Sequence, residues 1–174
     1  MSTAQIPEID GLSDYRGNTY HTGNWPHEKI DFTGQRIAVV GTGSSGIQAI
    51  PVLAEEAEHV TVFQRTPNYS IPSQNGPMHR EYEASWKERY GDLREEMRYT
   101  GHGSIKDLND KPAMSVDEDE RQAIYKERWK IGGAGFLTSF NDLLFSQESN
   151  DTASEFVRQK IRQIVKDPET AEIL

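Results

Sequence analysis

The sequence predicts an α/β fold in which one β-α-β unit is followed by a longer helical segment. An apolar, β-rich run at 36–40 is followed at once by glycines 41, 43 and 46. A stretch with helical spacing then leads to a second β-rich run at 60–65. After residue 80 the chain is rich in charged residues, and its apolar residues recur at helical spacing. The first two observations predict the β-α-β unit, and the third predicts the helices.

Length and composition limit the classes of protein to which this chain can belong. Its 174 residues suffice for roughly one domain, and the absence of cysteine excludes disulfides and thiolate metal sites. A formal net charge of -9 argues against a general nucleic-acid binder. No stretch approaches the ~20 consecutive apolar residues of a membrane helix, and residues 1–10 lack a signal-peptide pattern. We therefore predict a cytoplasmic protein without nucleic-acid or membrane partners, whose oligomeric state stays open.

Residues 1–35 are predicted to form a connector without regular structure. Pro7 and Gly11, among acidic residues, favour turns. The bulk of Tyr15, Tyr20 and Trp25, so close together, suggests an ordered segment packed against a surface. The alternative is a surface loop that carries these aromatic residues by chance.

The β-α-β unit follows the connector. Residues 36–40 are continuously apolar, as in a strand buried on both faces. The next stretch is predicted to be a helix, and Pro51 inside it is expected to bend it. Its apolar residues at helical spacing are Ile47, Ile50, Leu53, Ala54 and Ala57. Residues 60–65 are β-rich and complete a unit of about 30 residues, whose crossover should be right-handed.

The rest of the chain is predicted to be helical between loops. Three prolines and a glycine make 66–79 a loop, and 100–120 is a second, polar loop. A helix over 80–98 carries an apolar and aromatic stripe, which we interpret as a packing face rather than as part of a cofactor site. The stripe consists of Tyr82, Trp86, Tyr90, Leu93 and Met97.

Two further helices are predicted, separated by the apolar run 136–145. The first lies within 117–133 and ends near Gly132 and Gly133, a plausible C-cap. The second begins at the capping-box pattern of Thr152 and Glu155 and stops at Pro168. Its apolar face consists of Phe156, Val157, Ile161, Ile164 and Val165.

The glycines at 41, 43 and 46 have the Gly-x-Gly-x-x-Gly spacing and stand between a predicted strand and helix. This context predicts a Rossmann-like, dinucleotide-binding β-α-β unit. Gly41 permits the tight turn, Gly43 lets a pyrophosphate approach the backbone, and Gly46 lets the helix pack close to the strand. The helix N-terminus offers free N–H groups and a positive dipole end to the phosphates, and Ser44 and Ser45 can add hydroxyl donors.

The end of the second strand predicts which dinucleotide binds. An NAD site has Asp or Glu at this point to bind the ribose 2′-hydroxyl, but 63–66 contains no acid. The Arg65 guanidinium can bind a 2′-phosphate through paired hydrogen bonds, and Thr66 can donate one more. The sequence therefore predicts NADP rather than NAD; the alternative is that Arg65 is an ordinary solvated arginine.

Only two strands can be identified, whereas a doubly wound nucleotide-binding domain needs about five or six. Two parallel strands with one crossover cannot cover their own faces and edges. We therefore expect the chain to be incomplete as a domain and a piece of a longer protein. A compact alternative has the helices folding back over the two-stranded sheet.

Residues 15–26 resemble the F-x-G-x-x-x-H-T-x-x-W-P fingerprint of type I Baeyer–Villiger monooxygenases. Five positions match, and Tyr15 replaces the phenylalanine. The matching residues are Gly17, His21, Thr22, Trp25 and Pro26. Residues 31–72 are also similar to the NADP-binding segment of that family. The resemblance is strongest over 7–76 and rests, beyond that, on the helical insertion typical of these enzymes.

This resemblance implies an NADPH- and FAD-dependent enzyme that inserts one oxygen atom of O2 next to a ketone carbonyl, giving an ester or lactone. It implies a connector with the fingerprint at 1–35, an NADP-binding unit at 36–76 and a helical insertion at 77–174. Arg65 and Thr66 would hold the 2′-phosphate, and His21 would be a coupling residue or a hydrogen-bonded loop histidine rather than a catalytic one. The implied pyrophosphate-binding residues are Thr42, Gly43, Ser44, Ser45, Gly46, Ile47 and Gln48.

The chain departs from the family pattern in ways that bear on activity. It holds no second glycine motif for FAD and no residue that matches the family's active-site arginine, so we expect FAD to bind mainly elsewhere and this segment to be inactive alone. Alternatives are an N- or S-oxygenating flavin monooxygenase, which the Thr22-x-x-Trp25-Pro26 ending disfavours, and a non-catalytic NADP-binding module. No metal site is predicted, because the five histidines are scattered; they are His21, His27, His59, His79 and His102.

Overall fold

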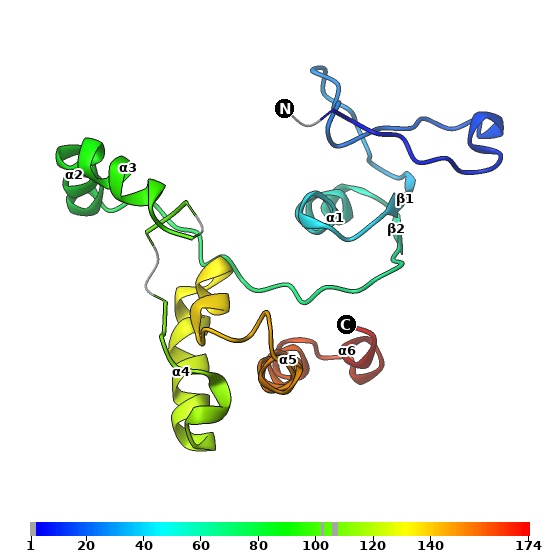
Figure 1. Ribbon diagram of the computed structural model, residues 1–174. Helices are drawn as coiled ribbons and strands as arrows, with labels where there is room; N and C mark the ends of the chain where they lie inside the picture. Colours follow the sequence, from blue (N-terminus) through cyan, green and yellow to red (C-terminus); the bar gives the residue numbers. More distant parts are fainter. Residues whose placement is uncertain (1–2, 102, 106–107) are drawn as a thin grey trace. The chain divides into compact units, whose positions relative to one another are not determined.

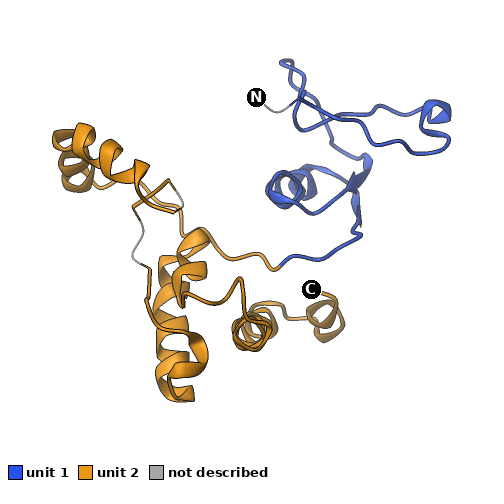
Figure 2. Ribbon diagram, in the orientation of Figure 1, with its two compact units in different colours: residues 1–68 blue, residues 69–174 orange. Residues whose placement is uncertain are grey.

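The computed structural model describes residues 3–101, 103–105 and 108–174. Two compact units make up the chain, Met1–Asn68 and Tyr69–Leu174 (Figure 2). His102, one of the five scattered histidines, lies outside the described residues. Each unit has its own packing and is described by itself.

Unit 1, Met1–Asn68, contains the β-α-β arrangement. Strand β1, Arg36–Val40, leads through helix α1, Ser44–Glu56, to strand β2, His59–Phe63 (Figure 1). The strands are parallel, with Arg36 opposite His59 and Val40 opposite Phe63. The two strands and the helix confirm the elements that the sequence predicts, although β2 ends two residues earlier than expected.

The prediction that β1 is buried on both faces is wrong. Burial alternates along the strand: Ile37 and Val39 are half-buried, whereas Ala38 is exposed and Val40 is 70% exposed. Successive side chains of a strand point to opposite faces, and the single helix α1, which contacts both strands, can cover one face only. Unit 1 thus has a covered and an uncovered sheet face.

The connector before β1 contains one short 3-10 helix, η1, Leu12–Asp14, and an isolated bridge between His21 and Asn24. Three of its aromatic residues pack on one another, whereas Tyr15 lies outside this cluster and is 62% exposed. The ring centroid of Tyr20 lies 5.6 Å from that of Trp25, and Phe32 lies 6.1 Å from both. The connector is therefore ordered by its own aromatic cluster.

Unit 2, Tyr69–Leu174, begins with two helices where the sequence predicts one. Helix α2 is Arg80–Glu88 and helix α3 is Tyr90–Arg98, with the break at Arg89 (φ −108°, ψ 15°). Gly91 lies two residues after the break, and glycine disfavours a helix by about 1 kcal/mol relative to alanine, so little holds the two segments in one helix. Of the predicted stripe, Leu93 is buried whereas Tyr82 and Tyr90 are exposed.

Helix α4, Glu118–Ile131, confirms the next predicted helix. The Asp117 carboxylate caps it by accepting the N–H of Glu120, so the preceding loop is shorter than predicted. Gly132, with φ 76°, ends it as expected. Two 3-10 helices flank α4: η2, Ala113–Ser115, and η3, Gly133–Thr138.

Helix α5, Gln147–Ile164, begins before the predicted capping box, which is therefore wrong. The true N-cap is Ser146, whose hydroxyl accepts the N–H of Ser149 at 3.3 Å. Thr152 lies inside the helix, and Ile164 of the predicted apolar face is 64% exposed. Pro168 does follow the end of α5, but it also occupies the first turn of helix α6, Pro168–Ile173.

The buried core of unit 2 is built around Tyr125. Its ring centroid lies 5.4–5.6 Å from those of three phenylalanines contributed by η3, the following loop and α5. The core cluster consists of Ala113, Tyr125, Phe136, Phe140, Leu143, Ala153, Phe156 and Val157. The apolar run at 136–145 is thus the centre of this unit. Over the residues described, none of the helices is both long and apolar enough to span a membrane.

Candidate functional site

The glycine loop turns sharply at the end of β1. Gly41 has φ +97°, a backbone conformation that glycine adopts without the steric cost of a Cβ. Its N–H donates to the carbonyl oxygen of Phe63 at 2.9 Å, so pairing with β2 extends one residue beyond the strand. The turn therefore starts from a fixed point at the carboxyl ends of both strands.

Gly46 brings helix α1 against this turn. A Cβ at Gly46 would overlap the carbonyl oxygen of Gly41, so a larger residue cannot occupy the position without a shift of the backbone. Gly43 is different, because a Cβ there would meet open space. The glycine spacing thus combines one close helix–loop contact with one side of the loop that is open to a ligand.

The N-terminus of α1 presents unpaired donors at the open side. Gly43 stands at the N-cap and contributes no side chain, and its carbonyl accepts the first helical hydrogen bond, from Ile47 N–H at 3.0 Å. Within the part of the chain that the structure describes, the N–H groups of Ser44, Ser45 and Gly46 have no acceptor. Such groups, with the positive end of the helix dipole, favour an anion.

The remaining predicted loop residues make local contacts. The Thr42 hydroxyl donates to Oε1 of Gln64 at 2.8 Å, and the Gln48 amide donates to the carbonyl of Ser44 at 2.6 Å. Ile47 is 38% exposed. The bond between Thr42 and Gln64 was not part of the sequence prediction, because nothing in the spacing of these residues reveals a contact across 22 positions.

Arg65 and Thr66 lie beyond the end of β2 and are both exposed. Val40 pairs with Phe63, so the residues that follow β2 leave the sheet at the same edge as the glycine loop. This is where open parallel sheets bind ligands. Among the described residues, the Arg65 guanidinium has no ion-pair partner, which leaves its charge available to an anion.

An open groove of about 610 Å³ lies between the connector and α1. Thr22 and Trp25 line it from the connector, and Ser45 and Gln48 line it from the first turns of α1. His21 is half-buried, and its Nδ1 accepts the N–H of Gly23 at 3.0 Å within the turn. Two fingerprint residues, Thr22 and Trp25, therefore line a groove together with the helix of the glycine loop, which the sequence did not predict. The apolar residues Ile30 and Phe32, which follow Trp25 in the sequence, were the signal that could have indicated this packing.

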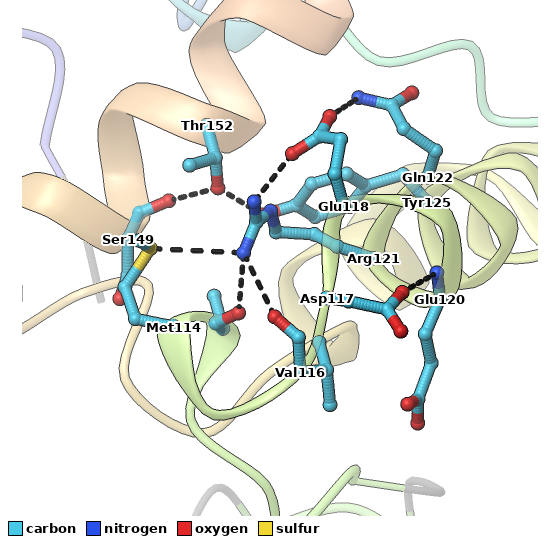
Figure 3. Close-up of polar contacts among 11 residues, drawn as sticks. Met114, Val116, Asp117, Glu118, Glu120, Arg121, Gln122, Tyr125, Ser149 and Thr152 are labelled. Carbon is cyan, nitrogen blue, oxygen red and sulfur yellow. Dashed lines mark hydrogen bonds and ion pairs between the residues drawn. The ribbon is translucent and has the colours of Figure 1, made fainter.

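Unit 2 contains a polar network around Arg121 (Figure 3). The guanidinium is buried and donates to the carbonyls of Ala113 and Val116, at 2.9 and 3.3 Å, and to the carboxylate of Glu118. The hydrogen bond from Arg121, with a second from Gln122, lowers the pKa of the Glu118 carboxyl.

A second chain of hydrogen bonds joins α4 to α5 in the same region (Figure 3). The Thr152 hydroxyl donates to the carbonyl of Ser149 at 2.7 Å, so its oxygen accepts the proton of the Tyr125 hydroxyl, also at 2.7 Å. Burial raises the pKa of the Tyr125 phenol. These contacts hold elements together, and within the described residues no group of acidic or histidine side chains could hold a metal ion.

No protein-family model matches the sequence. The chain is 39% identical to 2-oxo-Δ3-4,5,5-trimethylcyclopentenylacetyl-CoA monooxygenase of Pseudomonas putida, over 100% of this chain and 33% of that protein. It is 35% identical to a Baeyer–Villiger monooxygenase of Pseudooceanicola batsensis, over 100% of this chain and 32% of that protein. It is 38% identical to the phenazine N-monooxygenase PhzNO1 of Lysobacter antibioticus, over 98% of this chain and 32% of that protein.

Solved structures agree with these relatives. A steroid monooxygenase bound to NADP is 48% identical, with a TM-score of 0.86 over 99% of this chain and 33% of that one. OTEMO in complex with FAD and NADP is 40% identical, with a TM-score of 0.91 over 99% of this chain and 34% of that one.

The matched proteins are monooxygenases, and the two solved structures hold NADP. The chain is homologous over its whole length to Baeyer–Villiger monooxygenases, which confirms the resemblance found in residues 15–26 and 31–72. It spans about a third of the length of the relatives that it matches. The mixture of helices with a two-stranded parallel sheet is the fold of the corresponding segment in those structures.

Proposed function

We propose that this chain is the NADPH-binding part of an FAD-dependent Baeyer–Villiger monooxygenase that oxidises ketones to esters or lactones with O2, in the cytoplasm. One observation carries the proposal: the first N–H groups of α1 are unpaired within the described residues, and Gly43, directly before them, borders open space. That arrangement occurs in a chain homologous to proteins whose structures hold NADP.

The proposal treats β1, α1 and β2 as a Rossmann-like unit. Parallel strands, a crossover helix and a glycine turn at their carboxyl edge support this interpretation. The unit would occupy 36–76, preceded by a fingerprint-bearing connector at 1–35 and followed by a helical insertion at 77–174.

The residues at the loop fit a dinucleotide phosphate. Thr42 to Gln48 would surround the pyrophosphate, with the backbone N–H groups of Ser44 and Ser45 as donors and the open side of Gly43 as its place of approach. Arg65 and Thr66 would hold the 2′-phosphate. When bound, NADPH supplies the hydride and FAD supplies the oxygen-transfer chemistry. FAD would bind mainly outside this chain, because the sequence has one glycine loop of this kind and the proposal assigns it to NADPH.

We assign His21 a coupling role rather than a chemical one. Its ring nitrogen fixes the turn at 21–24, and the adjacent Thr22 and Trp25 line the groove against α1. A movement of the connector would therefore change the surroundings of the first turn of α1, the helix proposed to bind the phosphates.

The function is tested with the native protein that contains this sequence. Purified protein should show flavin absorbance, consume NADPH in the presence of a cyclic ketone, and release the corresponding lactone. A colourless protein that binds NADP+ would instead support a non-catalytic NADP-binding module.

One observation favours a second candidate. The 38% identity to a phenazine N-monooxygenase lies between the 39% and 35% identities to the other two relatives, so oxygenation at nitrogen or sulfur is a competing activity. Parallel assays with a cyclic ketone, an aromatic N-heterocycle and a thioether separate the two, since the product carries the oxygen at a different atom.

A further inference from the structure

Thr42 and Gln64 join the glycine loop to the end of β2 by a hydrogen bond of 2.8 Å between their side chains. Backbone pairing has ended at this point: the Gly41 N–H still reaches Phe63, but the positive φ of Gly41 then turns the chain away from β2. The side-chain bond is therefore the next link between the two segments after the last backbone link.

This link stands between two proposed phosphate-binding groups. On one side, Thr42 leads into Gly43 and the unpaired N–H groups of α1. On the other, Gln64 is followed directly by Arg65. Because Arg65 is exposed and lies outside the strand, no backbone ladder fixes its distance from the loop.

Resting on the proposed function, we propose that Gln64 is a positioning residue, which acts through Thr42 to hold the glycine loop and Arg65 at the spacing of the two phosphate groups of NADP. The Thr42 hydroxyl is used as a donor to Gln64, so Thr42 contributes to the loop by its position and not by donating that proton to a phosphate. Gln64 thereby favours ligands that carry both phosphates.

The test uses the native protein that contains this chain, and ligands that differ in one phosphate. Adenosine 2′,5′-bisphosphate reaches both groups, whereas adenosine 2′-monophosphate reaches only the Arg65 side. Dissociation constants for these ligands and for NADP+ are measured calorimetrically for wild type, Thr42→Val, Gln64→Leu and the double variant. Thr42→Ser retains the hydroxyl, and Gln35→Leu removes a glutamine bond elsewhere in unit 1, to the carbonyl of Asp31.

We expect Thr42→Val and Gln64→Leu each to weaken NADP+ and the bisphosphate about five-fold, the effect of one lost hydrogen bond. The double variant should be no weaker than either single one, because both remove the same bond. Affinity for the monophosphate should change less than two-fold, and Gln35→Leu should match wild type. Thr42→Ser, which keeps the hydroxyl donor, should recover the affinity that Thr42→Val loses.

Losses that add in the double variant, or an equal loss for the monophosphate, would overturn this inference, because Gln64 would then act by direct contact. Unchanged NADP+ affinity in Gln64→Leu would overturn it as well. In all of these outcomes wild type binds NADP+, so the proposed function stands. A wild-type protein that does not bind NADP+ overturns both.

Discussion

Gly46 of α1 packs so closely on Gly41 that a side chain at position 46 would overlap the Gly41 carbonyl oxygen. Three positions before Gly46 in the same motif, Gly43 faces open space. The two glycines therefore have different surroundings: packing in the protein excludes a side chain at Gly46, whereas under the proposed function it is the ligand that needs the space at Gly43.

Gly46→Ala and Gly43→Ala should consequently separate stability from binding. Gly46→Ala forces the backbone to shift and should destabilise the protein by about 1–3 kcal/mol, as overpacking does. Gly43→Ala has room and an ordinary φ of −68°, so its thermal midpoint should stay near that of wild type while NADP+ affinity falls. Thermal denaturation and calorimetry check this, and the opposite assignment of effects would contradict the geometry.

Arg65→Ala should reduce the affinity for NADP+ by about 10- to 100-fold, the range expected for lost hydrogen bonds to a charged group. The affinity for NAD+, which lacks the 2′-phosphate, should change little. Arg36→Ala is the matched control, because Arg36 is an exposed arginine at the opposite end of the strands. Equal affinities for both dinucleotides, unchanged in Arg65→Ala, would show that Arg65 does not select the cofactor.

Tyr125→Phe and Thr152→Val remove opposite ends of one partly buried hydrogen bond, and Thr152→Val should cost more. In Tyr125→Phe the Thr152 hydroxyl keeps its bond to Ser149, so the loss should be about 1 kcal/mol. In Thr152→Val the buried phenol loses its acceptor, and an unsatisfied buried group costs about 1–3 kcal/mol. Denaturant unfolding of both variants measures the difference, and a smaller loss for Thr152→Val would refute the assigned direction of donation.

Glu118 should contribute pH-dependent stability through its bond to Arg121. Its folded-state pKa lies below the ordinary value of 4.5, so the contribution is present above that value and is lost as the pH falls through the lowered pKa. Glu118→Gln should therefore lower the melting temperature at pH 7 and have little effect at pH 3. Glu127→Gln, on the same helix, serves as control; a penalty for Glu118→Gln that is as large at pH 3 as at pH 7 would exclude this role.

Much of the fold could be predicted from local patterns. The strand 36–40, the glycine turn and the C-cap at Gly132 each depend on residues close in sequence, and the structure contains all three. The start of α5 was misplaced because the true N-cap, Ser146, is followed three residues later by Ser149 and lacks the Glu or Gln of a capping box. Thr152 has that pattern but lies inside the helix.

The errors about unit 1 concern long-range packing, which no local pattern records. The apolar run of β1 indicates burial on two faces, but Ala38 and Val40 are exposed because α1 covers only the other face. The groove lined by Trp25 and Gln48, and the bond between Thr42 and Gln64, join segments more than 20 residues apart. The spacing of residues in the sequence was enough to propose the candidate binding residues, but it did not predict the contacts that these residues make with one another.

Unit 1 has another property that follows from its half-covered sheet. Among the residues described, every residue below 9% exposure lies in unit 2, so the glycine loop belongs to the part of the chain with the less buried interior. Amide hydrogens should exchange with solvent faster in β1 and β2 than in α4 and α5. A ligand present at 100 times its Kd adds about 2.7 kcal/mol to the stability of the state that binds it. Cofactor binding would then contribute to the folding of the loop that holds it.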